Sequence, residues 1–583
     1  MKKTFRIAPS SILIYLILAA VIPAVSFADN QVEQEKQLLA ALESINELDG
    51  SILLHFLASD LLEGREISTP GYLTASEYAA SLFALWGLQA PGTEKSNSPE
   101  TAGNAQGHPY ERFFQSFELR EVNSVKNRAV IVKQSGESLL TRELQEDVDF
   151  SFQSDSAWTI DAPVVFAGYG IVEEKLGYND YRGLDVRGKV VLILEGTPGG
   201  DDPASPFRSE EMKIKYSATS QRGHGRTGFN PGNLARSKGA LALVKIAEPG
   251  PEGRDFRRRL IDRRQLDDRK AIIPGKSRSF RLLEHQSRQF EASLPTVLLG
   301  AEQALSMFAL AGKSLPRQRE IIDRNFKPAS TTLPGIRLRL ESEVRSELVR
   351  CRNVIAVLPG SDPTLKEEYV VVGAHLDHLG RRGEYLFNGA DDNASGSVGV
   401  LQVARAMAGL QLKPARSVIF ALWTGEEKGL LGSRYFVANS PVPVKKIKAY
   451  LNLDMIGTPW TMERLQRMAR IWNMELPEKL RQEGASAADF LALSHSRHDF
   501  VENNLRRANE RLGLKLHLRP SDRAGGGSDH TSFGLADVPW VFFMAGMGEN
   551  YHRPGDHPQT VDLKLMTRIS RLVFLSAYYL AGE

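Results

Sequence analysis

The sequence predicts an α/β protein with a central, mostly parallel mixed sheet flanked by helices, and with an inserted β-rich domain. From residue 352 onward, near-continuous apolar runs alternate with helical spacing, as expected of strands buried on both faces of a sheet. From about 120 to 340, shorter β-rich runs are bounded by Gly, Pro and Asp. A chain of 583 residues is also too long for one hydrophobic core.

The first 28 residues have the pattern of a secretory signal peptide. A basic start is followed by an apolar stretch at 12–25, and Ser26-Phe27-Ala28 places small residues at the two positions that signal peptidase reads. An uncleaved anchor is the alternative, because the segment 7–28 carries no charge and is long enough to span a bilayer. Pro23 and the cleavage-like tripeptide favour removal. We therefore expect an exported protein, periplasmic or secreted, with no membrane span after cleavage.

Residues 29–120 are predicted to be a helical N-terminal part of the main domain. Apolar side chains recur at helical spacing in two stretches, at 38–45 and at 78–86. Between these stretches, Thr69-Pro70-Gly71 predicts a turn directly before the second helix.

Residues 121–345 are predicted to form the inserted domain. Its expected strands are the β-rich runs at 163–169, 189–194, 240–246 and 294–299. Two long linkers, at 205–235 and 250–292, are rich in Arg, Ser and Gly. Acidic residues are interleaved in the second linker, so we interpret it as a solvated loop rather than an anion-binding patch.

Residues 346–583 are predicted to form the α/β core. Its expected strands are 354–358, 369–373, 417–423, 449–453 and 538–544, and its clearest amphipathic helix is 397–410. A charged segment at 460–515 is expected to be a helical excursion that forms a lid or rim.

The charge balance argues against a nucleic-acid partner, and the cysteine content excludes an internal disulfide. Lys and Arg total 73 against 70 for Asp and Glu, and three of the basic residues lie in the first 28 positions. The mature chain would be formally neutral, so no nucleic-acid partner is expected. Cys351 is the single cysteine, which excludes an internal disulfide and favours an inert residue at a strand start.

Five residues that can bind metal follow strand-like runs or open a helix. They are His375, Asp391, Glu427, Asp454 and His552. Ligands gather at the carboxyl edge of an open α/β sheet, and these positions belong to different strands of the predicted core. Each residue alone has an ordinary structural explanation, such as a helix cap for Asp391. Separate explanations of this kind do not account for all five residues together.

The residue types suit metal-assisted hydrolysis. Zinc binds neutral imidazole and carboxylate oxygen, and two zinc ions that share one carboxylate need two histidines and two further carboxylates. Asp377, two residues past His375, is suited to orient that imidazole. Glu426 would point away from Glu427 on an extended segment, toward a bound water as general base. We expect His378 to be a structural or rim residue rather than a third histidine ligand.

The motifs around these residues resemble those of the co-catalytic di-zinc aminopeptidases, a family that includes bacterial leucyl aminopeptidases and relatives of glutamate carboxypeptidase. The matching motifs are His-Leu-Asp-His-Leu-Gly at 375–380, Asn-Gly-Ala-Asp-Asp-Asn-Ala-Ser-Gly at 388–396, Gly-Glu-Glu at 425–427, Asn-Leu-Asp-Met-Ile-Gly at 452–457 and Gly-Ser-Asp-His at 527–530. The resemblance covers 352–583, and Leu-Glu-Gly-Arg at 62–65 also resembles exported bacterial members.

The resemblance implies a zinc-exopeptidase fold with two zinc ions per chain and peptide substrates. His375 and Asp454 would serve one ion and Glu427 and His552 the other, with Asp391 as the bridge. The insert would be a protease-associated domain. After His552 the chain reads Arg-Pro-Gly-Asp where the family often has Thr-Pro-Asp-Asp, which changes the neighbouring substrate contacts. His557 is not expected to be a ligand.

The leading hypothesis is an exported aminopeptidase, with Asp529 as one candidate for binding the substrate's α-amine. A carboxypeptidase or dipeptidase of the same family is an alternative, for which Arg381, Arg382 or Arg553 could supply charge. A glutaminyl cyclase with a single zinc is a second alternative, and a non-catalytic receptor on a peptidase scaffold is a third. The side-chain preference and the oligomeric state do not follow from the sequence.

Overall fold

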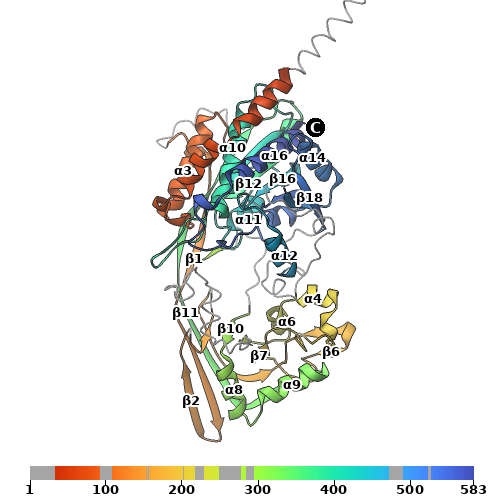
Figure 1. Ribbon diagram of the computed structural model, residues 1–583. Coiled ribbons are helices and arrows are strands. Elements are labelled where there is room, and N and C mark those ends of the chain that lie inside the picture. The colour runs from red at the N-terminus through yellow and green to blue at the C-terminus, as the bar shows by residue number, and fades with distance from the viewer. Residues whose placement is uncertain are drawn as a thin grey trace, which may run out of the picture.

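The computed structural model describes residues 33–91, 108–146, 148–152, 154, 156–200, 202–216, 229–247, 278–283, 294–471, 490–522 and 527–582. The predicted signal peptide and most of the Arg-rich linkers lie outside these residues. Figure 1 shows a C-terminal region above and an insert below, joined by the ribbon of β1 (Phe114–Ser135) and β11 (Thr331–Leu358).

The C-terminal region is built on parallel strands. β12 (Tyr369–His375) pairs in parallel with both β15 (Ser417–Trp423) and β16 (Ile447–Leu453), and β16 pairs in parallel with β19 (Trp540–Phe543). The end of β11 joins antiparallel to β15, which makes the sheet mixed. Each of these strands coincides closely with a predicted apolar run, and the predicted fold class is confirmed.

Helices cover both faces of this sheet. One face packs against α2 (Glu47–Leu57), α3 (Pro70–Leu85), α10 (Gly396–Ala408), α14 (Asp499–Glu510) and α16 (Leu563–Gly582), and the other against α11 (Leu431–Ala438) and α15 (His530–Gly534). The predicted turn before α3 is its N-terminus, where the Thr69 side chain accepts the backbone N–H of Tyr72 and Pro70 occupies the first turn.

The insert has its own core and its own parallel strands. β4 (Trp158–Phe166), β7 (Val190–Leu194), β8 (Ala242–Ile246) and β10 (Thr296–Leu299) pair in that order, and α8 (Ala301–Leu310) and α9 (Leu315–Asn325) pack on them. The predicted limits at 121 and 345 fall inside β1 and β11, because one antiparallel ribbon runs through both regions. Smaller elements are β2 (Ser138–Leu144), β3 (Phe150–Ser151), β5 (Val172–Glu173), β6 (Tyr178–Asn179), α4 (Glu210–Tyr216), α6 (Pro231–Ser237) and β9 (Ser279–Leu282).

The segment 460–515, predicted to be helical, is helical only in part. α12 (Met462–Ile471) and α14 are helices, but β17 (Phe490–Ser496) and β18 (Lys515–Ser521) extend the sheet beyond β19. Leu491 and Leu493 are fully buried at alternate positions of β17. This period of two is the pattern of a strand with one buried face.

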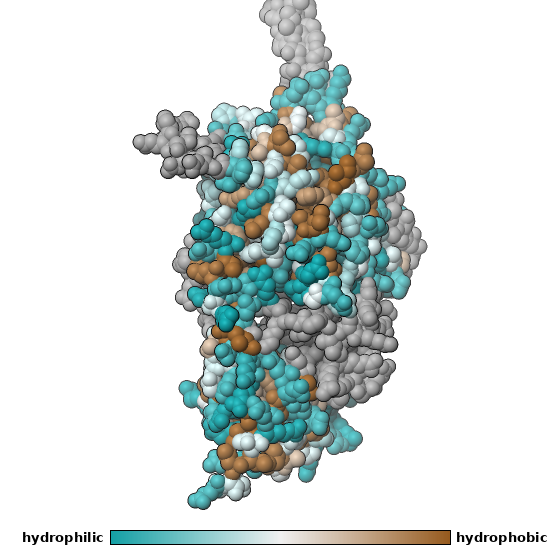
Figure 2. All heavy atoms as spheres, turned by 90° about the vertical axis from the view of Figure 1, so that its left-hand side faces the viewer, coloured by the Kyte–Doolittle hydropathy of each residue, from teal (hydrophilic) through white to brown (hydrophobic). Residues whose placement is uncertain are grey.

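The surface carries scattered hydrophobic residues. Figure 2 shows a face on which hydrophilic residues predominate, with hydrophobic residues in small groups. The most exposed large hydrophobic side chains are Leu61, Leu85, Leu48, Leu139 and Ile52. Scattered exposure of this kind is ordinary for a folded protein. Among the described helices, none is long and apolar enough to cross a membrane.

Candidate metal centre

The candidate centre lies at the carboxyl ends of three parallel strands. His375 is the last residue of β12, Asp454 directly follows β16, and Glu427 follows β15 after a short turn. Asp392 comes from the irregular turn Ala390–Ser395, which precedes α10, and His552 lies in the turn after β19. These chain segments therefore lie together at one edge of the sheet, as the sequence predicted.

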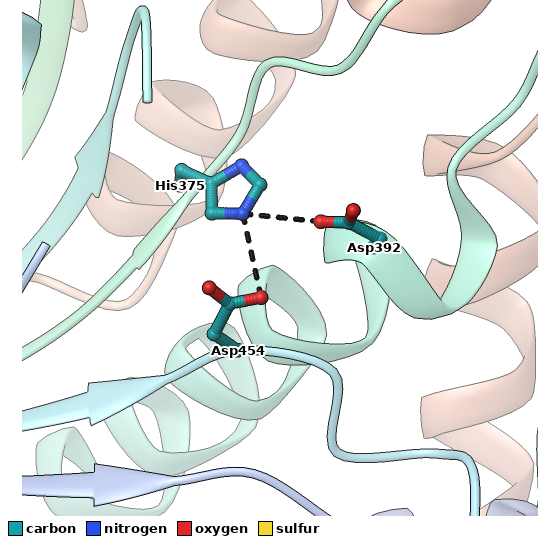
Figure 3. A group of neighbouring side chains, drawn as sticks. All are labelled: His375, Asp392 and Asp454. Atoms are coloured by element: carbon teal, nitrogen blue, oxygen red, sulfur yellow. Dashed lines mark ion pairs between the residues drawn. The ribbon is translucent and has the colours of Figure 1, made fainter. Parts of the chain in front are cut away.

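The first cluster joins His375, Asp392 and Asp454. Nε2 of His375 lies 3.3 Å from Oδ1 of Asp392 and 3.5 Å from Oδ1 of Asp454. Figure 3 shows both carboxylates pointing at the same ring nitrogen from different elements. The three side chains are buried, with exposed fractions of 8% or less.

The second cluster shares Asp392 with the first. Nε2 of His552 lies 3.1 Å from Oδ2 of Asp392 and 3.2 Å from Oε2 of Glu427. One oxygen of Asp392 thus faces each cluster, which is the arrangement of a bridging carboxylate. The His552 side chain is 37% exposed, so the second cluster is the one that solvent can reach.

The structure places Asp392, rather than the predicted bridge Asp391, between the two clusters. Oδ1 of Asp391 accepts the backbone N–H of Gly457 at 2.8 Å and the Ser395 hydroxyl at 3.3 Å, and Asp391 belongs to neither cluster. The backbone of Asp392 is not helical (φ −110°, ψ 91°), so the two adjacent carboxylates point in different directions. Sequence spacing cannot distinguish two neighbouring aspartates in such a turn.

The spacing of the nitrogen and oxygen atoms in the two clusters is that of ligands around a metal ion rather than that of a hydrogen-bonded network. Nε2 of His375 and Oδ1 of Asp454 are buried and have no hydrogen-bond partner among the described residues. Atoms that bind a tetrahedral zinc at about 2.0–2.2 Å lie about 3.3–3.6 Å from one another. The distances of 3.1–3.5 Å within the two clusters are close to this range. Two imidazoles and three carboxylates are also the chemistry that zinc prefers.

Asp377 orients two residues of the site. Its backbone carbonyl lies 3.0 Å from Nδ1 of His375, while its carboxylate is 4.0 Å from that nitrogen. The carboxylate instead accepts the backbone N–H of Glu426 at 3.1 Å. Asp377 therefore holds His375 through its main chain and the Glu426 turn through its side chain. Burial raises the pKa of Asp377 to about 6.

The electrostatics of the site favour a proton acceptor at Glu426. Burial raises the pKa of Glu426 well above its usual value, and the carboxylates of Glu427 and Asp454 add to this effect, although His375 opposes it. Burial also acts to raise the pKa of Glu427, but His552 and His378 outweigh it and lower that pKa. Adjacent carboxylates thus differ in proton affinity, which is the pattern of a base beside a ligand.

His378 is fully buried and lies inside the site rather than at a rim. Its Nδ1 is 2.7 Å from Oε1 of Glu427, the oxygen that does not face His552. The two oxygens of Glu427 are thus divided between two histidines. Sequence reasoning underrated His378, although its position three residues after His375 was a usable signal.

The remaining candidates lie outside both clusters. Asp529 is fully buried, and burial raises its pKa to about 7. Nδ1 of His557 lies 3.3 Å from the Asn388 amide. Arg382 is paired with Glu66 at 3.0 Å, which reduces its value as a binding group for a substrate carboxylate.

The fold and the site together define an α/β protein with a histidine–carboxylate metal centre at the carboxyl edge of its sheet. Residues 353–577 match the family model of Peptidase family M28. This match confirms the resemblance of the C-terminal region to the zinc aminopeptidases. It does not extend to the insert, whose identity as a protease-associated domain stays a prediction.

Individual relatives support the same region. Over 108 residues the chain is 43% identical to leupeptin-inactivating enzyme 1 of Streptomyces exfoliatus, which covers 18% of this chain and 23% of that protein. Over 127 residues it is 40% identical to an aminopeptidase of Pseudomonas aeruginosa, covering 22% of each. The chain thus aligns with about a quarter or less of the length of these relatives.

A solved structure supports the whole fold. The aminopeptidase from Aneurinibacillus sp. strain AM-1 superposes with a TM-score of 0.52 at 17% identity, over 93% of this chain and 95% of that one. At this identity the likeness concerns the fold alone. It extends across both the C-terminal region and the insert.

Proposed function

We propose that the protein is an exported, zinc-dependent aminopeptidase that hydrolyses N-terminal residues from peptides. The observation that carries this proposal is the pair of clusters that share Asp392 within the region similar to Peptidase family M28. The name aminopeptidase on the Pseudomonas relative supports the choice of reaction. Export rests on the signal-like residues 1–28.

The five side chains would hold two zinc ions. His375 and Asp454 would bind one ion and Glu427 and His552 the other, with one oxygen of Asp392 on each. When bound, zinc lowers the pKa of a coordinated water and polarises the scissile carbonyl. The remaining steps belong to the residues of the chain.

Glu426 acts as the general base in this proposal. It sits beside Glu427, on a turn whose backbone N–H is held by the Asp377 carboxylate. Its raised pKa suits a group that takes a proton from the attacking water and returns it to the leaving amine. The solvent-exposed edge of His552 marks the side from which a peptide enters.

The test is zinc content measured together with hydrolysis of free and N-acetylated aminoacyl anilides. Two zinc ions per chain with cleavage of the free-amine substrates alone would support the aminopeptidase. One zinc with cyclisation of N-terminal glutamine would favour the glutaminyl cyclase, and two zincs with cleavage at free C-termini the carboxypeptidase. Absence of bound zinc after purification in zinc-containing buffer would contradict the proposal.

Localisation needs a separate test. Expression of the full chain followed by N-terminal sequencing of the exported product should give a start after Ala28. A product that keeps the first 28 residues and sediments with membranes would overturn the export by cleavage.

A further inference from the structure

The turn that carries Asp392 is hydrogen-bonded on two sides by buried charged residues. On one side the Arg65 guanidinium donates to the backbone carbonyls of Asn388 at 2.7 Å and Gly389 at 2.9 Å. On the other side the Asp556 carboxylate accepts the backbone N–H groups of Asp391 at 2.9 Å and Asp392 at 3.1 Å. The backbone carbonyl of Asp556 also accepts the N–H of Ala390 at 3.2 Å.

Arg65 is a costly residue to bury, which argues for a specific task. Its side chain is fully buried, and the hydrogen bonds described for it all go to backbone carbonyls rather than to carboxylates. Burial lowers the pKa of Arg65 to about 10, although Asp556 and Asp377 oppose that shift from a distance. A buried charge without a direct counter-ion is retained only where other interactions stabilise it.

Arg65 also reaches the segment that carries the first histidine. Its Nε donates to the carbonyl of Leu376 at 2.8 Å, directly after His375, and its own carbonyl accepts the N–H of His378 at 3.2 Å. One side chain thereby connects the segments that carry His375 and Asp392. These segments come from different elements, so their separation is not fixed by the local sequence.

Two glycines show how closely the segments approach. Gly64, next to Arg65, has φ +70°, and a Cβ there would lie 2.3 Å from the carbonyl oxygen of Phe387. Gly389 has φ +58°, and a Cβ there would lie 2.4 Å from Cγ of His378, which comes from the segment after β12. Only glycine permits both the backbone conformation and the approach. The Arg65 loop is therefore fitted against the turn rather than loosely covering it.

We propose that Arg65 and Asp556 are positioning residues that together form a clamp on the Asp392 turn and preform the shared metal-binding carboxylate. Arg65 binds the carbonyls before Asp392, and Asp556 binds the N–H groups up to and including it. Neither side chain needs to touch metal or substrate. The inference rests on the proposed metal centre and adds to it how the bridging group is held in place.

The test compares zinc affinity of folded protein, by competition with a chelator, in Asp556→Asn and Arg65→Lys. Asp556→Asn keeps the size of the side chain but loses one of its two acceptors. Arg65→Lys keeps the charge but not the planar array of donors. We expect zinc affinity to fall about 10–100-fold in each, with kcat falling and KM nearly unchanged, as for other residues that orient metal ligands.

Matched controls separate positioning from general stability. Asp180→Asn changes a buried aspartate of the insert that also accepts backbone N–H groups, from Tyr169 and Ile171. Arg352→Lys changes an arginine that donates to the carbonyl of Leu73, away from the site. Both controls should lower the thermal midpoint without changing the zinc affinity of the folded fraction.

The outcomes distinguish this inference from the proposed function. If the unsubstituted protein binds two zincs and Asp556→Asn binds them equally tightly, the clamp is wrong while the metal centre stands. If the unsubstituted protein binds no zinc, the proposed function itself fails. Should Arg65→Lys not fold, the near-isosteric Asp556→Asn still decides the question.

Discussion

The two regions of the molecule bury carboxylates in opposite ways. In the insert, Asp180 is fully buried but is saturated with donors: the N–H groups of Tyr169 and Ile171, each at 3.0 Å, and the Tyr178 hydroxyl at 2.8 Å. In the C-terminal region, Oδ1 of Asp454 and Nε2 of its neighbour His375 are buried without a hydrogen-bond partner among the described residues. A buried carboxylate whose oxygens all accept hydrogen bonds stabilises the folded structure. A buried cluster of imidazole and carboxylate atoms without hydrogen-bond partners instead indicates a binding site for a metal ion.

The difference does not come from the architecture. Both regions have parallel strands whose carboxyl ends form an edge suited to binding. In the insert, Gly-rich turns such as Gly168-Tyr169-Gly170 follow β4, while His375 and Asp454 end the strands of the C-terminal region. Within the described residues, both groups suited to hold metal lie in the C-terminal region. The function is thus a property of the side chains placed on the edge, not of the sheet.

The largest effect is expected from removing the carboxylate shared by the two clusters. The Asp392→Asn variant should fail to bind at least one zinc ion and should lose nearly all hydrolytic activity. The reason is that both clusters share this carboxylate and lose its negative charge at once. Asp391→Asn should keep both zincs, since its carboxylate bonds to Gly457 and Ser395 instead. Metal analysis of both purified variants checks this. The reverse order of effects would restore Asp391 as the bridge.

This pair also shows where sequence reasoning stops. Apolar runs predicted the core strands, and three of the residues singled out after them, His375, Glu427 and Asp454, lie together in the structure. Strand ends are fixed by burial, which the sequence displays directly. The direction of Asp391 against Asp392 depends on the backbone of one irregular turn, which is set by Arg65 and Asp556 from distant parts of the chain.

The other misses do not all have this cause. Arg65 owes its role to contacts between segments far apart in the sequence, so no local pattern reveals it, whereas the spacing of His378 from His375 is a local signal. The strand β17 was hidden because its apolar run at 490–493 is short and lies within a longer segment rich in charged residues. By contrast, the predicted strands of the insert agree with β4, β7, β8 and β10 to within a few residues, because each is a compact apolar run between turn residues.

The next effect in size concerns catalysis without loss of metal. Glu426→Gln should reduce kcat by about 10²–10⁴-fold, because the amide cannot accept a proton. Zinc content should be unchanged, since Glu426 belongs to neither cluster. Glu195 provides the control from the insert, because it follows β7 much as Glu426 follows β15. Full activity in Glu426→Gln, or equal loss in Glu195→Gln, would remove the proposed base.

Metal removal should act on one region only. With zinc at about 1,000 times its dissociation constant, each bound ion stabilises the folded state by about 4 kcal/mol. Chelation should therefore speed amide hydrogen exchange in β12 and at the start of α10, which carry the site. Exchange in β7 and β8 of the insert should be unaffected, because Asp180 relies on protein donors alone. Equal loss of protection in both regions would show that the insert depends on the metal as well.

The smallest effect concerns an ion pair between Arg278 and Glu121, which lies on β1 at the start of the insert. Arg278 donates to Glu121 at 2.7 Å from Nε and 2.6 Å from a terminal nitrogen. Burial acts to raise the pKa of Glu121, but the hydrogen bonds from Arg278 and Asn123 outweigh it and lower that pKa. The folded-state pKa is then below the unfolded value of about 4.3, so the stabilisation is present above about pH 4 and lost as the pH falls through the folded-state pKa.

Because Arg278 is 29% exposed, we expect only about 0.2–1 kcal/mol from this pair. The measurement is the free energy of unfolding of metal-free protein and of metal-free Glu121→Gln between about pH 6 and about pH 3. Metal-free protein is needed because acid also releases zinc by protonating its ligands. The difference between the two proteins should shrink toward low pH. A difference that stays constant with pH would mean that Glu121 contributes by packing and that its charge does not stabilise the fold.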